Sequence, residues 1–380
     1  MTRVAVLGAG LVGRVLARDL ASDPELEVLA VDSSEAALRE IGGFPGIETR
    51  ATDLSNPDEM GRAATEADVV VGALPGRLGA SLQRAVIEAG RPLVDISFTP
   101  EDPLALDGLA RRHKVPVVVD CGVAPGLSNL FAGCSSAEME RVETVLIYVG
   151  GLPLRRVWPY EYRIVFSPTD VIEEYLRPSR FRENGEEVVR PALSDVELLD
   201  FPRAGTLEAF NTDGLRTLLG TIPAPTLKEK TLRYPGHAER MRMLRETGFF
   251  DSEPVEVGKT RIAPRELTER LLFRAWQPVE GEEEFTLLRV IVEGLRGKRR
   301  VRTTWDLFDR TDPASGTSSM ARTTAFPCAI VARLLARGRW TRAGVHAPEI
   351  LGRDREVVDL ILEELAARGI QISRQETTLS

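Results

Sequence analysis

The stretch RVAVLGAGLVGRVLARDL, residues 3–20, joins a short apolar run to a glycine-rich turn and then to an amphipathic segment. Its glycines Gly8, Gly10 and Gly13 fit the pattern G-x-G-x-x-G, which is typical of a dinucleotide-binding turn when a strand precedes it and a helix follows. The first glycine permits the bend, the second lets the backbone approach a pyrophosphate, and the third lets the helix pack on the strand. The stretch therefore predicts the start of a Rossmann domain.

A second predicted strand, EVLAVD (27–32), ends in Asp32, nineteen residues after Gly13. A carboxylate at this place accepts hydrogen bonds from the ribose hydroxyls of NAD and repels the 2′-phosphate of NADP. Backbone N–H groups at the start of the helix, at Leu11 and Val12, would face the phosphates. We therefore expect NAD as the cofactor. The alternative is an ordinary strand–helix turn that binds nothing.

Strands and helices continue to alternate through the first third of the chain. Apolar runs at 67–76, 91–98 and 115–122 are separated by helical patterns such as that of 81–90. This alternation is typical of an α/β fold with a doubly wound parallel sheet, in which ligands bind beyond the carboxyl ends of the strands. The residues at those ends that we expect near the cofactor are Asp53, Ala73, Leu74, Pro75, Asp95, Ser97 and Asp120. For each one, the alternative is a residue that caps the following turn.

The pattern changes after about residue 125. Residues 140–153 form a long predicted strand, and 160–167 and 284–310 have the period-two alternation of strands, the last with a hairpin turn at Gly297–Lys298. These features predict a mixed or antiparallel sheet in an α+β domain. The stretch 251–283 is charged and helical in pattern. The tail contains two predicted helices, within 319–340 and 356–373.

Composition excludes several classes of protein. A net charge of −8 and a pI near 5.3 argue against nucleic acid as a partner. The sequence has no apolar run long enough to span a membrane, and it starts directly with a predicted strand, so we expect a cytoplasmic protein. Its three cysteines have no metal-binding spacing, so no metal is expected.

Several motifs together resemble the saccharopine dehydrogenase family: GAGLVG (8–13), VDCGVAPGLSN (119–129), YVGGLP (148–153), EKTLRYPGH (229–237) and GVHAPE (344–349). Within that family the spread of motifs is most similar to the lysine 6-dehydrogenase branch. The resemblance implies a Rossmann domain built from both chain ends around an inserted catalytic domain, which we place at 1–124, 125–318 and 319–380. It also implies oxidation of L-lysine at the ε-carbon, giving an aldehyde, ammonia and NADH. Saccharopine reductases carry an aspartate where this chain has Ala124.

The reaction implied by the resemblance needs a base and a carboxylate-binding group, because the ε-ammonium has a pKa of about 10.4. Pro235 and Gly236 predict that EKTLRYPGH is a turn that faces the substrate. Arg233 suits the α-carboxylate, and His237 or Lys230 is expected to handle protons. The alternative is a solvated surface turn.

Further candidates come from neighbouring motifs. Asp95 and Asp120 could act as a base or hold an ammonium group. Tyr234 and Glu161 could face the substrate, and the backbone of Gly150 and Gly151 could contact its amine.

Two rival functions stay open. One is a saccharopine or carboxyspermidine-type reductase, and the other is a regulator that senses NAD without turnover. A homodimer through the sheet of the second domain is expected.

Overall fold

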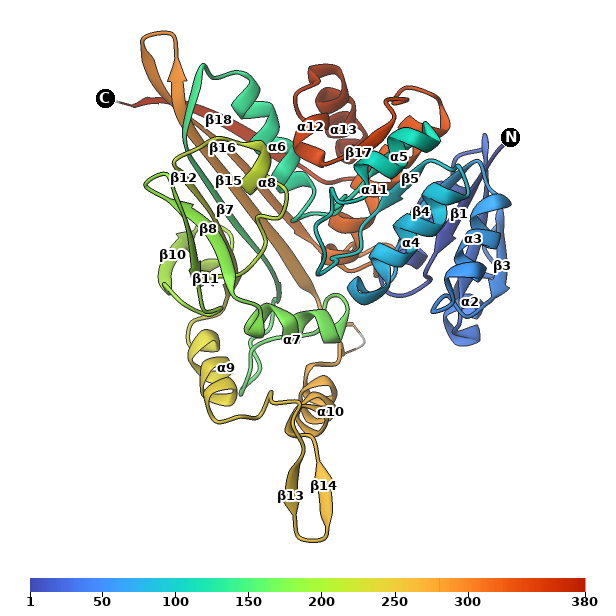
Figure 1. Cartoon of the computed structure of the whole chain (residues 1–380). Coiled ribbons are helices and arrows are strands. Elements are labelled where there is room, and N and C mark those ends of the chain that lie inside the picture. The colour runs from blue at the N-terminus through green and yellow to red at the C-terminus, as the bar shows by residue number, and fades with distance from the viewer. Residues whose placement is uncertain (280, 380) are drawn as a thin grey trace.

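Seven parallel strands form the first sheet of the computed structural model, which describes residues 1–279 and 281–379 (Figure 1). The strand order is β17-β6-β5-β4-β1-β2-β3, and every pairing is parallel. The strands are β1 (Thr2–Leu7), β2 (Leu26–Asp32), β3 (Ile47–Ala51), β4 (Val69–Gly72), β5 (Leu93–Asp95), β6 (Pro116–Val118) and β17 (Gly344–His346). This topology confirms the expected Rossmann-type sheet.

Helices cover both faces of this sheet because its central strands are apolar on both sides. In β1, Val4 and Val6 pack in one cluster with α1 and α11, whereas Ala5 and Leu7 pack in another with α3 and α4. The helices of this half are α1 (Gly13–Ala21), α2 (Glu35–Ile41), α3 (Pro57–Thr65), α4 (Gly76–Glu88), α5 (Asp107–His113) and α11 (Ser319–Ala336).

The second sheet has nine strands and is mixed, as expected. Its main path is β10-β11-β12-β7-β15-β16-β18, with β12 parallel to β7 and the other neighbours antiparallel; β8 and β9 branch from β12. The strands are β7 (Arg141–Pro153), β8 (Ser179–Glu183), β9 (Glu186–Arg190), β10 (Glu197–Phe201), β11 (Gly205–Asn211), β12 (Thr226–Arg233), β15 (Glu284–Arg296), β16 (Arg299–Arg310) and β18 (Ile372–Leu379). The predicted hairpin turn at Gly297–Lys298 joins β15 and β16.

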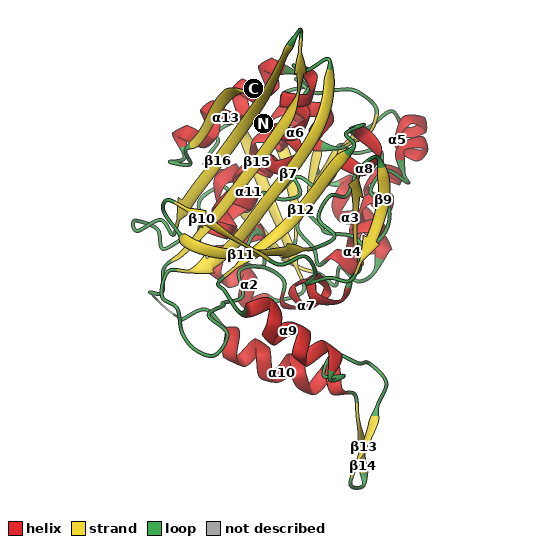
Figure 2. Ribbon diagram, turned by 90° about the vertical axis from the view of Figure 1, so that its left-hand side faces the viewer, coloured by secondary structure: helices red, strands yellow, loops and turns green. Residues whose placement is uncertain are grey.

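Helices α6 and α11 pack on the side of the second sheet that faces the first sheet. Figure 2 shows the opposite side, where no described helix lies over β7, β12, β15 or β16. The expected dimer through this sheet stays a prediction. The remaining elements are α6 (Leu127–Ala137), α7 (Pro168–Leu176), α8 (Leu218–Thr221), α9 (His237–Glu246), α10 (Pro264–Trp276), α12 (Pro348–Leu351), α13 (Arg355–Ala367), β13 (Val255–Val257) and β14 (Thr260–Ile262).

The C-terminal part of the chain joins the two halves. Helix α11 contacts both sheets, β17 extends the first sheet at β6, and β18 extends the second sheet at β16. The last described residues thus lie in the second sheet, whereas α11 and β17 contact the first sheet.

Two predicted elements differ in the structure. Residues 160–167 are irregular and not a strand, because Tyr162 and Ile164 pack into a cluster with Trp276 of α10, and the Ile164 N–H bonds the Trp276 carbonyl. The stretch 251–283 contains α10, as its helical pattern indicates, but also the projecting hairpin β13–β14 (Figures 1 and 2). In the described chain, no helix combines the length and apolar character that crossing a membrane requires.

Candidate functional site

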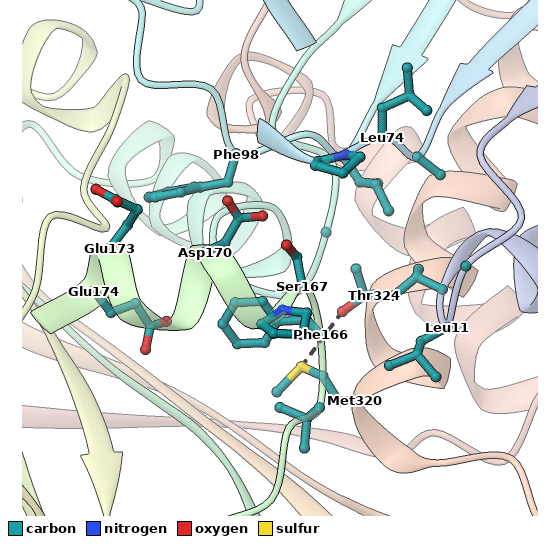
Figure 3. A pocket seen from close by; sticks show the side chains of 18 of the residues that line it. Leu11, Leu74, Phe98, Phe166, Ser167, Asp170, Glu173, Glu174, Met320 and Thr324 are labelled. Carbon is teal, nitrogen blue, oxygen red and sulfur yellow. Dashed lines mark hydrogen bonds between the residues drawn. The ribbon is translucent and has the colours of Figure 1, made fainter. Parts of the chain in front are cut away.

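A cavity of about 610 Å³ lies where the carboxyl ends of the first sheet meet the second sheet. Residues after β1, β2 and β4 line one end, and residues of β7, β12 and α7 line the other. Figure 3 shows Asp170, Glu173 and Glu174 on α7 at one side of the cavity and Leu11 and Thr324 at the other. One cavity therefore joins the glycine-rich turn to the second half of the molecule.

The glycine-rich turn has the geometry that a dinucleotide site needs. Gly8 has φ +110°, and a Cβ there would lie 2.3 Å from the Ala73 carbonyl oxygen. A Cβ at Gly13 would lie 2.0 Å from the Gly8 carbonyl oxygen, so helix α1 packs against the turn only because this residue is glycine. A Cβ at Gly10 would meet no described atom within 4 Å. Gly10 lines the cavity, so its backbone is open to a phosphate, and the turn fits a dinucleotide.

Asp32 lies at the end of β2 on the cavity wall. Its carboxylate accepts hydrogen bonds from the Ala9 N–H and the Ser34 N–H, each at 2.7 Å. These bonds fix the carboxylate beside the turn, where a ribose would lie. The other lining residues at this end include Ser33 and Asp53, which are not cationic.

Most of the residues that we predicted for the cofactor line this cavity. They are Gly8, Gly10, Leu11, Val12, Gly13, Asp32, Asp53, Ala73, Leu74 and Pro75. Ser97 does not line it, because it is buried between its lining neighbours Ile96 and Phe98; Asp95 and Asp120 are also absent from the lining. The role of the lining residues in binding stays a prediction.

Carboxyl groups gather at the other end of the cavity. Asp170 and Glu174 project from α7, and Glu229 projects from β12. Burial raises the pKa of all three groups above the usual carboxyl values. For Asp170 and Glu229, the described residues supply no ion-pair partner, so this end of the cavity is suited to a cation.

Arg233 lies in the last position of β12 and also lines this end. Its guanidinium is 2.9 Å from the Glu174 carboxylate and lies over the Tyr162 ring, with 4.8 Å between the guanidinium carbon and the ring centroid. The side chain is buried, and its Nε–H has no partner among the described residues. The Nε–H is itself shielded from solvent, so this buried arginine has one unsatisfied donor.

The structure does not bring Lys230 to the cavity. EKTLRYPGH is not a single turn: residues 226–233 form β12, in which Glu229, Thr231 and Arg233 share one face, and Lys230 points to the other. The Lys230 ammonium is 2.8 Å from Glu197 and donates to the Asp195 carbonyl. The interpretation of Lys230 as a proton acceptor at the site is therefore corrected.

His237 also does not line the cavity. It begins α9 and is 1% exposed, with its ring nitrogens 2.9 Å from the Tyr175 hydroxyl and 3.2 Å from the Tyr160 carbonyl. Burial, together with the charge of Arg233, lowers the pKa of His237 to about 3. His237 therefore stays neutral near pH 7 and packs against Tyr175. The expectation that His237 is the base is corrected, because its ring is buried among structural partners.

Two other substrate candidates, Tyr234 and Glu161, have structural partners. Tyr234 donates its hydroxyl to the Pro153 carbonyl at 2.8 Å, and Glu161 pairs with Arg156 at 2.9 Å; neither lines the cavity. Gly150 and Gly151 do line it, on β7.

Asp95 and Asp120 lie below the cavity wall, not on it. Asp95 is fully buried and accepts hydrogen bonds from the Gln83 amide at 2.8 Å and from the Ser97 N–H at 2.9 Å. Asp120 forms a buried ion pair with Arg216 at 3.0 Å. Asp120 thus connects the two halves of the molecule, and neither carboxylate is free to hold a substrate ammonium.

Sequence reasoning missed several lining residues, including Asp170, Glu174, Thr212, Glu229, Thr231, Met320 and Thr324. The period-two alternation of Glu229, Thr231 and Arg233 was a usable signal, but a turn was predicted for this stretch.

Two family models match the chain and together cover nearly all of it. The Saccharopine dehydrogenase NADP binding domain matches residues 4–145, and the Saccharopine dehydrogenase C-terminal domain matches residues 122–370. Among curated relatives, the alpha-aminoadipic semialdehyde synthase of Arabidopsis thaliana is 25% identical over 74% of this chain and 30% of its own length. The mitochondrial enzyme of that name from Bos taurus is 22% identical over 99% of this chain. The chain spans 48% of that relative.

A relative of similar length is the saccharopine dehydrogenase [NADP(+), L-glutamate-forming] of Schizosaccharomyces pombe, which is 23% identical over 99% of both chains. The solved structure of apo saccharopine dehydrogenase (L-Glu forming) from Saccharomyces cerevisiae covers 100% of both chains with a TM-score of 0.80 and 19% identity, and shares the fold. With the two family models spanning both halves, these matches place the chain in the saccharopine dehydrogenase family.

Proposed function

We propose that this protein is a nicotinamide-dependent dehydrogenase that acts on a carbon–nitrogen bond of an amino acid, and that its substrate is L-lysine, oxidised at the ε-carbon. The observation that carries this proposal is the continuity of the cavity: the glycine-rich turn lies at one end, and the carboxyl groups of Asp170, Glu174 and Glu229 lie at the other. A coenzyme held at the turn would share the cavity with a cationic amine held by the carboxyl groups.

The charges of the cavity favour lysine. Lysine carries two ammonium groups and one carboxylate, and the cavity offers two carboxyls without an ion pair, Asp170 and Glu229, beside the buried Arg233. We propose that Arg233, which lines this end of the cavity, holds the α-carboxylate through its guanidinium. The bound coenzyme supplies the hydride acceptor, and the protein supplies a base, because nitrogen releases hydride from its carbon only after losing a proton.

A second candidate substrate is saccharopine, which has three carboxylates. Three arginines line the cavity, Arg77, Arg177 and Arg233, and could pair with them. The Schizosaccharomyces pombe relative is named a saccharopine dehydrogenase, which supports this candidate. Against it, the carboxyl groups of Asp170 and Glu229 at the same end of the cavity would repel additional carboxylates.

For the coenzyme form, the family and the site point in different directions. The family model is described as NADP binding, and the Schizosaccharomyces pombe relative is named for NADP(+), which favours NADP. The end of the cavity around Asp32, Ser33 and Asp53 is acidic, and no lysine or arginine follows β2 directly to hold a 2′-phosphate. On this ground we propose NAD.

A panel of single amines tests these proposals. Purified protein is given NAD or NADP with L-lysine, saccharopine or carboxyspermidine, and absorbance of the reduced coenzyme is followed. We expect turnover with lysine and NAD. Turnover with saccharopine alone would overturn the choice of lysine, and a higher kcat/KM with NADP would reject the argument from Asp32. Coenzyme binding without turnover of any amine would support a sensor.

A further inference from the structure

Glu229 has surroundings that single it out among the carboxyl groups of the cavity. It sits in the middle of β12, between β7 and β11, and is 4% exposed. The Thr212 hydroxyl donates to its Oε2 at 2.7 Å, and the Gly214 N–H donates to the same oxygen at 3.1 Å. No described residue donates to Oε1. One oxygen is therefore fixed, and the other is available on a residue that lines the cavity.

The turn beside Glu229 is shaped to hold this carboxyl group. A Cβ on Gly214 would lie 2.5 Å from both Cδ and Oε2 of Glu229, so a side chain there would displace the carboxyl. The Thr212 hydroxyl is also 2.8 Å from the Thr231 hydroxyl, which lines the cavity. The Thr212 hydroxyl and the Gly214 N–H thus orient the carboxyl group directly, and the Thr231 hydroxyl acts through Thr212.

The charged groups around Glu229 set its proton affinity. Glu174 on α7 and Asp213 after β11 are acidic, and Arg233 lies on the same face of β12. Burial is the largest effect and raises the pKa of Glu229 to about 8, with Glu174 and Asp213 acting in the same direction and the bonds from Thr212 and Gly214 against it. A base whose pKa lies near the working pH is efficient at both taking up and releasing a proton.

We propose that Glu229 is the catalytic base of the amine oxidation, a role that rests on the function proposed above. Ionised Glu229 takes a proton from the ε-ammonium, leaving a free amine. The nitrogen lone pair then forms a C=N bond as hydride passes from the ε-carbon to the oxidised coenzyme. Water adds to the iminium carbon, the C–N bond breaks, and an aldehyde and an ammonium ion leave. The proton held by Glu229 returns to solvent, which balances the reaction.

The variant Glu229→Gln has nearly the same shape as the protonated glutamate and carries no charge, so it is expected to fold. We expect kcat with lysine to fall by about 10²–10⁴-fold, whereas the Kd of the coenzyme stays unchanged. For the wild type, log kcat/KM should rise with pH up to about 8, because only the ionised carboxylate acts as the base. This rise should be absent in Glu229→Gln.

Two further variants make the test specific. Glu197→Gln is the matched control, because Glu197 contacts Lys230 on the opposite face of β12; its rate and pH profile should equal those of the wild type. Thr212→Val removes a bond that favours the ionised carboxylate, so the rise of kcat/KM should shift to higher pH, with the rate at the alkaline plateau retained.

The outcomes separate the two proposals. If the wild type oxidises lysine and Glu229→Gln has the same rate and pH profile, Glu229 is not the base, and the proposed function is retained. An unshifted profile in Thr212→Val likewise rejects Glu229 as the titrating group. If the wild type oxidises no amine, the proposed function is wrong, and so is the role of Glu229 as its base.

Discussion

At the scale of single residues, the buried carboxyl of Glu229 makes stability depend on pH. Its pKa in the folded protein is about 8, above the usual value of 4.5, so the folded state binds a proton more tightly than the unfolded state. Stability then falls as pH rises from about 4.5 to about 8, since the unfolded chain loses this proton first. We expect Glu229→Gln to raise the melting temperature relative to wild type at pH 8 and to leave it nearly equal at pH 4.5. Calorimetry at both values checks this; an equal difference at the two pH values would contradict it.

Arg233 offers a test of carboxylate binding. Arg233→Lys keeps the positive charge beside Glu174 but loses the planar guanidinium, which binds a carboxylate through parallel hydrogen bonds. Loss of one charged hydrogen bond costs about 1.5–3 kcal/mol, so KM for lysine should rise about 10- to 100-fold, with coenzyme Kd unchanged. Steady-state kinetics and a coenzyme titration measure both. A KM within about twofold of the wild type, which is under 0.5 kcal/mol, would remove Arg233 from the substrate site.

How well the sequence predicted each residue depended on how local its environment is. The glycines of the first turn were predicted because their roles follow from a short segment and its flanking elements. Lys230 and His237 were chosen because lysines and histidines are few in this chain. The orientation of their side chains is set by β12 and α9, whereas a turn was predicted for this stretch. Glu229 was passed over for the same reason.

At the scale of elements, β18 is an edge strand that is paired over its whole length. It pairs with β16 from Ile372 to Leu379, and its Arg374 forms an ion pair with Glu138. A chain that ends at Ile370 should melt at a lower temperature and associate more readily, because β16 becomes an open edge. Coenzyme affinity should be retained.

Arg374→Gln is the control for this truncation, because it keeps the strand pairing and removes the partly exposed ion pair with Glu138, worth about 0–1 kcal/mol, and the contact with the Trp305 ring. Light scattering and thermal melting distinguish the two variants. A truncated chain that melts and scatters like the wild type would show that β18 contributes nothing to the sheet.

Long elements were predictable, and short ones were not. Strand β7 and the hairpin of β15 and β16 carry enough alternating residues to identify them. The segment 160–167 alternates as well, but Tyr162 and Ile164 meet α10 from a distant part of the chain, and tertiary packing decided its shape. The hairpin β13–β14 has three residues in each strand, too few for a pattern.

At the scale of the whole molecule, one buried ion pair connects the two halves. Asp120 follows β6 in the first half, and Arg216 comes from the second half between β11 and α8. Arg216 also donates to the Thr99 hydroxyl at 3.1 Å. The side chains of the pair are 2% and 1% exposed, so Arg216→Met would leave a buried carboxylate without a partner.

The expected cost of Arg216→Met is about 3–5 kcal/mol in the free energy of unfolding. The double variant with Asp120→Asn should recover part of this loss, because no uncompensated charge stays buried. Denaturant unfolding of both variants checks the prediction. A double variant less stable than the single one would show that charge burial is not the cause.

The position of β17 has a consequence for synthesis of the chain. Strand β6 is complete by residue 118, but its outer partner β17 is formed by residues 344–346. At about 5–20 residues per second, a ribosome needs on the order of tens of seconds to make the intervening segment. During that time the nascent first sheet presents the unpaired edge of β6, which is open to association with other strands. The order of strands in the finished sheet thus sets a period of vulnerability during translation, which ends when nearly the whole chain has been made.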